Sequence, residues 1–105
     1  MPQLSEATIQ MNFSSAMRQA QQLENLAAEL SRLSTNELSA SLSAIAGAWK
    51  GDSSNLFLQK GNALAGQISD SAQALRNAAR DIQSIARRTY NAEMRALELA
   101  RLREV

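Results

Sequence analysis

The sequence predicts an all-α protein made of two long antiparallel helices. Two observations predict this fold class. Alanine, leucine, glutamine, glutamate and arginine are abundant, and the only proline, Pro2, leaves nothing after it that would interrupt a helix. The 105 residues suit one small domain, or one protomer of an assembly whose core is shared between chains. We therefore expect a single domain over 1–105, with helix one at about 6–46, a turn at about 47–51 and helix two at about 53–101.

Apolar and small residues form one stripe along the first helix. They follow one another at alternating spacings of four and three residues, which is the pattern of a helical seam. After Leu30 the spacing changes to successive fours, at Ser34, Leu38 and Leu42. A continuous helix absorbs this drift by a local change of supercoil, and we favour it because no Gly or Pro enforces a break. The alternative is a new helix that starts at Ser34, with Glu37 completing a capping box. The stripe before this change consists of Ile9, Phe13, Ala16, Ala20, Leu23, Ala27 and Leu30.

The second helix carries the same alternation without interruption. The run 52–54 that precedes it is rich in N-cap residues, so the helix should begin there. The stripe consists of Phe57, Gly61, Leu64, Ile68, Ser71, Leu75, Ala78, Ile82, Ile85, Thr89, Ala92, Ala96 and Leu99. Together the two stripes predict a hairpin or dimer core that contains Phe13, Leu23, Leu30, Leu64, Ile68, Leu75, Ile82 and Ile85.

The segment "GAWKG", residues 47–51, joins the two stripes and holds two of the four glycines and the only tryptophan. Two long helices of matched length joined by so short a segment fold back as an antiparallel hairpin. Trp49 has two compatible interpretations, an apolar plug at the end of the hairpin and an aromatic anchor for a partner. Gly51 either permits a backbone conformation that other residues resist or leaves room for the indole.

A bare hairpin of this kind leaves much apolar surface in water. Met17, Leu26 and Leu33 widen the first stripe beyond the narrow seam of a two-stranded coil. Helices gain most of their stability from packing, so further apolar surface must cover them. The sequence therefore predicts dimerisation into an elongated four-helix bundle, either as a homodimer or as a heterodimer with a similar helical hairpin.

The composition excludes several classes of function. Without cysteine or histidine the chain has no disulfide, no thiolate or imidazole catalysis and no ordinary zinc site, so we expect no enzyme, no cofactor and no metal. Residues 76–105 carry seven arginines against four acids, which is too weak a basic cluster, with too few aromatics, to predict a nucleic-acid partner. The stripes are rich in alanine and the chain is poor in lysine, which argues against membrane contact. The N-terminus has no basic segment followed by an apolar one, so export would not use a cleaved signal peptide.

The triplet Trp49–Lys50–Gly51 stands near the midpoint of the chain, between two periodic segments of equal length. This arrangement resembles the WXG family of small Esx-like proteins, which are substrates of type VII secretion, and the resemblance covers essentially the whole chain. It implies a hairpin that dimerises head-to-tail and is exported folded, from the cytoplasm to the outside, through an apparatus driven by a membrane ATPase. It further implies a secreted effector in virulence or bacterial competition, or a secretion partner.

The resemblance also implies a composite secretion signal. In the family, the Trp–Xaa–Gly turn of one protomer lies near a C-terminal motif of the other, in which Tyr is followed by three residues and then Asp or Glu. Here Tyr90 is followed by Glu93, so the acid arrives one position early. On a helix both spacings place the acid on the same side as the phenol. The alternative function is a targeting chaperone that pairs with the helical N-terminal region of a larger type VII toxin.

Overall fold

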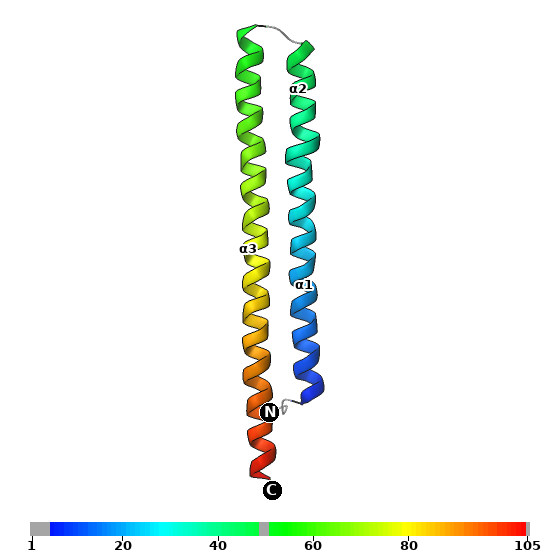
Figure 1. Ribbon diagram of the computed structural model, residues 1–105, viewed down its shortest axis with the longest axis vertical. Coiled ribbons are helices and arrows are strands. Elements are labelled where there is room, and N and C mark those ends of the chain that lie inside the picture. The colour runs from blue at the N-terminus through cyan, green and yellow to red at the C-terminus, as the bar shows by residue number, and fades with distance from the viewer. Residues whose placement is uncertain (1–4, 49–50, 105) are drawn as a thin grey trace. The chain divides into compact units, whose positions relative to one another are not determined.

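The structure, a computed structural model, describes residues 5–48 and 51–104, and all of its regular elements are helical (Figure 1). Helix α1 spans Glu6–Arg32, a π-helix η1 spans Leu33–Leu38, α2 spans Ser39–Ala48 and α3 spans Asp52–Arg103. The prediction of an all-α chain is confirmed, and no strand occurs among the described residues.

The contacts divide the chain into two compact units, each with a share of α1 and of α3. Unit 1 comprises Met1–Leu23 and Asn77–Val105, and unit 2 comprises Glu24–Arg76. In unit 1 the helices run antiparallel, because Glu6 pairs with Arg101 whereas Phe13, later in α1, contacts Tyr90, earlier in α3.

Unit 2 is a helical hairpin. Ser31 accepts a hydrogen bond from Arg76, whereas Ser34, one turn later, bonds to Ala65 and Ser69. The segments of unit 2 therefore also run antiparallel.

Helix α1 begins at a polar cap. The backbone N–H of Thr8 donates to Ser5 Oγ at 3.1 Å, and the Ile9 N–H donates to the Ser5 carbonyl at 3.0 Å. These bonds satisfy donors that the first helical turn would otherwise leave unpaired. Glu6 in the first turn complements the helix dipole.

The irregular spacing after Leu30 corresponds to the π-helix η1. Arg32 and Ser39, on either side of it, have right-handed helical torsions, with φ of −65° and −62°, so the chain does not leave the helical conformation there. A π-turn holds more residues than an α-turn, because its hydrogen bonds reach five residues back. It therefore accommodates the four-residue spacing and keeps Ser34 and Leu42 on one face, where they are 2% and 6% exposed.

The chain reverses into α3 at a glycine in the left-handed region. Gly51 has a φ of +119°, and nothing lies within 4 Å of the position that a Cβ would take. Its backbone conformation, rather than a lack of space, is therefore what favours glycine. The Gly51 carbonyl accepts hydrogen bonds from the N–H of Ser54 at 3.1 Å and from its hydroxyl at 2.7 Å, and Asp52 occupies the first turn of α3.

Alanines form the buried seam of α3. Ala65 and Ala72 are buried in unit 2, and Ala79 and Ala86 are buried in unit 1, each seven residues after the one before. Their small side chains let a neighbouring helix approach closely. In unit 2 the approach is close at Gly61, where a Cβ would lie 2.7 Å from Leu42 Cδ1.

Candidate functional site

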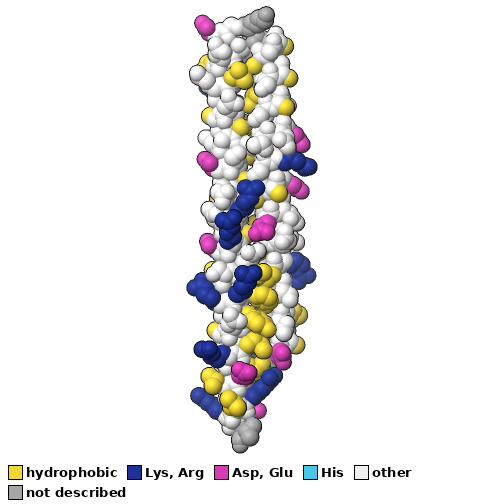
Figure 2. Space-filling model, in the orientation of Figure 1, with side chains coloured by type: hydrophobic (Ala, Val, Ile, Leu, Met, Phe, Trp, Pro, Cys, Tyr) yellow, Lys and Arg dark blue, Asp and Glu magenta, His cyan; other side chains and the backbone are white. Residues whose placement is uncertain are grey.

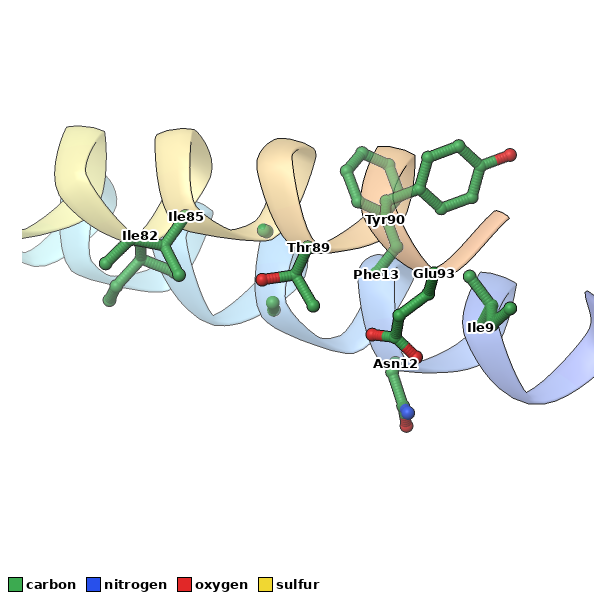
Figure 3. A pocket seen from close by; sticks show the side chains of 10 residues that line it. Ile9, Asn12, Phe13, Ile82, Ile85, Thr89, Tyr90 and Glu93 are labelled. Carbon is green, nitrogen blue, oxygen red and sulfur yellow. The ribbon is translucent and has the colours of Figure 1, made fainter. Parts of the chain in front are cut away.

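The candidate site is a groove in unit 1, between the beginning of α1 and the later part of α3. It encloses a cavity of about 260 Å³ (Figure 3). The residues of both helices that line it are Ile9, Asn12, Phe13, Ala16, Ile82, Ile85, Ala86, Thr89, Tyr90 and Glu93. This volume is below the roughly 300–1,000 Å³ that small-molecule sites occupy.

An aromatic pair lines the groove. The rings of Phe13 and Tyr90 have centroids 5.0 Å apart and are tilted by 45°. Such tilted contacts are favourable because the positive edge of one ring meets the negative face of the other. The Tyr90 hydroxyl accepts a long, weak hydrogen bond of 3.5 Å from Gln10 Nε2. Both aromatic residues are half-buried, so part of each stays in contact with solvent.

The remaining wall of the groove is mostly apolar, although Asn12 and Thr89 also line it. Ile9 is 1% exposed and Ala86 is 9% exposed, so both are buried, whereas Ile85 at the edge is 55% exposed. Figure 2 shows hydrophobic side chains gathered on this face of unit 1, over α1 and α3. The groove is therefore an apolar surface on the outside of the helix pair.

Carboxylates continue the groove toward the C-terminal end of α3. Glu93 is half-buried and lines both the apolar cavity and a second one of about 500 Å³. Glu6 in the second cavity pairs with Arg101 at 3.6 Å. Among the described residues none forms an ion pair with Glu93 or Glu104. The second cavity is lined by Ser5, Glu6, Glu93, Ala96, Leu97, Ala100, Arg101 and Glu104.

The structure brings together two of the four predicted signal residues. Tyr90 and Glu93 line the same groove of unit 1. Gly51 belongs to unit 2, where it precedes α3. Trp49 lies outside the described residues, so both interpretations of its indole stay predictions.

The predicted core residues fall into two groups. Leu64 and Ile85 are 49% and 55% exposed, so they lie outside the buried seams of their units. That either belongs to the core of a dimer stays a prediction. The half-buried group consists of Phe13, Leu23, Leu30, Ile68, Leu75 and Ile82.

The sequence reasoning missed a buried polar contact in unit 2. The Ser34 hydroxyl donates to the Ala65 carbonyl at 2.6 Å and shares a hydrogen bond of 3.0 Å with Ser69 Oγ. The Ser39 hydroxyl donates to the Ser34 carbonyl at 3.0 Å, within the span of the π-turn. The available signal was a serine at a seam position where the spacing changes. This contact stabilises the helix pair and forms no part of the groove.

In the part of the chain that the structure describes, no cluster of acidic or other metal-ligating side chains could hold a metal ion. No helix there is both apolar enough and long enough to cross a membrane. No family model, no curated protein and no solved structure matches the chain. The resemblance to the WXG family therefore rests on the residues alone.

Proposed function

We propose that the chain is a non-enzymatic protein exported by type VII secretion, which acts as a dimeric effector or secretion partner through contacts with other proteins. The observation that carries the proposal is the position of Trp49–Lys50–Gly51. The last described residue of α2 is Ala48 and α3 begins at Asp52, so the triplet lies in the sequence between these two elements. The positive φ of Gly51 supports backbone conformation as the reason for glycine at the third position of the triplet.

Exposed apolar side chains in each unit support dimerisation. A half-exposed leucine or isoleucine that a partner covers contributes about 1 kcal/mol. Two copies, or this chain and a similar hairpin, would bury these faces in a four-helix bundle. In unit 1 the exposed apolar residues are Met11, Ile85, Leu99 and Leu102, and in unit 2 they are Leu26, Leu33, Ile45, Leu56 and Leu64.

Tyr90 and Glu93 form the second half of the proposed export signal. They are three residues apart on α3, and both side chains reach the groove of unit 1. This placement supports joint recognition of a phenol and a carboxylate, with the Trp–Xaa–Gly turn of the partner chain nearby. The membrane ATPase of the secretion apparatus is the proposed receptor of this composite surface.

Replacing Trp49 tests the proposal. Trp49→Ala should abolish export, while helicity by circular dichroism and dimerisation by sedimentation change little. Trp49→Phe is the matched control, because it keeps an aromatic ring at the turn. Export is measured as the fraction of the protein in the culture medium of a strain with a type VII apparatus. Unchanged export of Trp49→Ala would refute the signal role.

The early position of Glu93 favours a second candidate function. If the altered spacing weakens the chain's own signal, the chain acts as a targeting chaperone for a larger toxin and depends on that toxin's signal. Co-expression with the product of the neighbouring gene separates the two functions. A stable complex with that product supports the chaperone, and a stable homodimer that ignores it contradicts the chaperone.

A further inference from the structure

We infer that the groove of unit 1 binds an amphipathic helix of a different chain, which places a bulky apolar side chain against Phe13 and Tyr90 and a Lys or Arg against Glu93. The inference rests on the proposed function, in that it assumes action through a protein partner. It adds the chemistry by which that partner is selected.

The apolar half of the groove supplies the anchor. Ile9 and Ala86 form a buried wall, and the two half-buried rings of Phe13 and Tyr90 line the same cavity. Large apolar side chains that fill such a desolvated recess carry a disproportionate share of binding energy at protein interfaces. A leucine or aromatic residue on a partner helix satisfies this half of the site.

Glu93 determines which charge the occupant must carry. Its half-buried side chain lines the same cavity, so a helix that covers the apolar wall also covers the carboxylate. Covering a charge without a partner costs several kcal/mol, more than the burial of one leucine returns. Because no described residue forms an ion pair with Glu93, the occupant itself must supply the cation.

The adjoining cavity also favours a positively charged occupant. It adds the carboxylates of Glu6 and Glu104, and Arg101 is the only basic residue among the described residues that line it. Arg101 is already paired with Glu6, which leaves Glu104 and Glu93 to attract a positive charge. On a partner helix, residues four positions apart lie on one face, so an apolar residue followed by Lys or Arg one turn later fits both halves of the groove.

Two synthetic helical peptides of about 20 residues test the inference with the full chain. One carries Leu and Lys four residues apart on an alanine-rich helix, and in the other Glu replaces that Lys. Binding is measured by fluorescence anisotropy at low and high salt. We expect the Lys peptide to bind at least tenfold more tightly than the Glu peptide, with a smaller ratio at high salt.

Substitutions of Glu93 establish where the preference arises. Glu93→Gln should abolish the preference for the Lys peptide, and Glu93→Arg should reverse it. Glu98→Arg is the matched control, because Glu98 is exposed on α3 and lines neither cavity, and it should leave the preference largely intact. A preference that survives Glu93→Gln, or the absence of binding by either peptide, would overturn the inference.

A second copy of the chain is the competing occupant. If Ile85→Lys abolishes self-association and the Lys peptide cannot displace the homodimer, the groove belongs to the homodimer and the inference is wrong. The proposed function fails separately, through unchanged export of Trp49→Ala. A parent chain whose groove shows no charge preference, while export is still lost in Trp49→Ala, refutes the inference alone.

Discussion

Deletion of Asn36 from the π-helix should leave the fold of unit 2 intact. Each residue of an α-helix turns the chain by about 100°, so a one-residue deletion normally rotates one side of a buried seam away from its partner. The seam of unit 2 is exceptional at one point. Ala27 and Ser34 are seven residues apart, but Ser34 and the next buried residue, Leu42, are eight apart. Without Asn36 this interval also becomes seven, which a regular α-helix places on one face.

The matched control is deletion of Gln67, an exposed residue in α3. It shortens the interval from Ala65 to Ala72 from seven residues to six, so one of the two must leave the seam. Rotating the earlier side away removes the hydrogen bond of Ser34 to the Ala65 carbonyl, worth about 1 kcal/mol net, and exposes Leu42, worth about 2 kcal/mol. The control should therefore lose about 3 kcal/mol, whereas the Asn36 deletion should change the free energy of unfolding by no more than about 1 kcal/mol.

Urea unfolding followed by far-ultraviolet circular dichroism measures both deletions. The proteins are compared at equal concentration, because association makes apparent stability depend on it. We expect a transition midpoint close to that of the parent for the Asn36 deletion and a large loss of stability for the Gln67 deletion. Equal losses for the two deletions would refute the interpretation of η1 as one extra residue in an otherwise regular seam.

The same unfolding assay checks three further predictions. Ser34→Ala should cost about 1–2 kcal/mol because its hydroxyl makes two buried hydrogen bonds to α3, and an unchanged midpoint would show that these bonds contribute nothing net. Gly66→Ala should stabilise by about 1 kcal/mol, since its Cβ meets open space. Gly61→Ala should not stabilise the parent, because the new Cβ would clash with Leu42, but it should stabilise a chain in which Leu42 is also alanine. Equal effects of Gly61→Ala and Gly66→Ala in the parent would contradict the close approach of Leu42 to Gly61. Gly51→Ala should cost about 1 kcal/mol because alanine resists a φ of +119°, and a neutral result would mean that the turn relaxes readily.

The class of fold could be predicted from the sequence because it depends on local properties. Helix-favouring residues without an internal proline predict helix, and the glycines around Trp49 indicate where it is interrupted. The π-helix could not be predicted in the same way. The four-residue spacing after Leu30 fits a change of supercoil, a new helix at Ser34 or a π-turn. Which of these forms depends on the contacts that Ser34 makes with α3, residues far away in the sequence.

The groove of unit 1 was predictable only in part. Tyr90 and Glu93 lie three residues apart on one helix, so helical geometry alone places them on one side. Phe13 and Ile9 reach the groove from the other helix, and their place beside Tyr90 depends on the register between two segments that are more than 70 residues apart. A stripe repeated every seven residues fits several such registers equally well, so the sequence pattern cannot select one.

The seam of α3 explains why the predicted core and the buried residues differ. The four–three pattern selected Leu64 and Ile85 because they are larger and more apolar than their neighbours, yet Ala65 and Ala86 are the buried residues. If Leu64 and Ile85 were buried instead, they would hold the helices farther apart and the alanines would face outward. Little apolar surface would then remain for a partner. Burying the alanines brings the helices of each unit close together and leaves leucine and isoleucine half-exposed beside the seam. In a helix pair that functions alone, these larger apolar side chains would stay in water. The register therefore supports the proposal that the apolar face of each unit is covered by another chain.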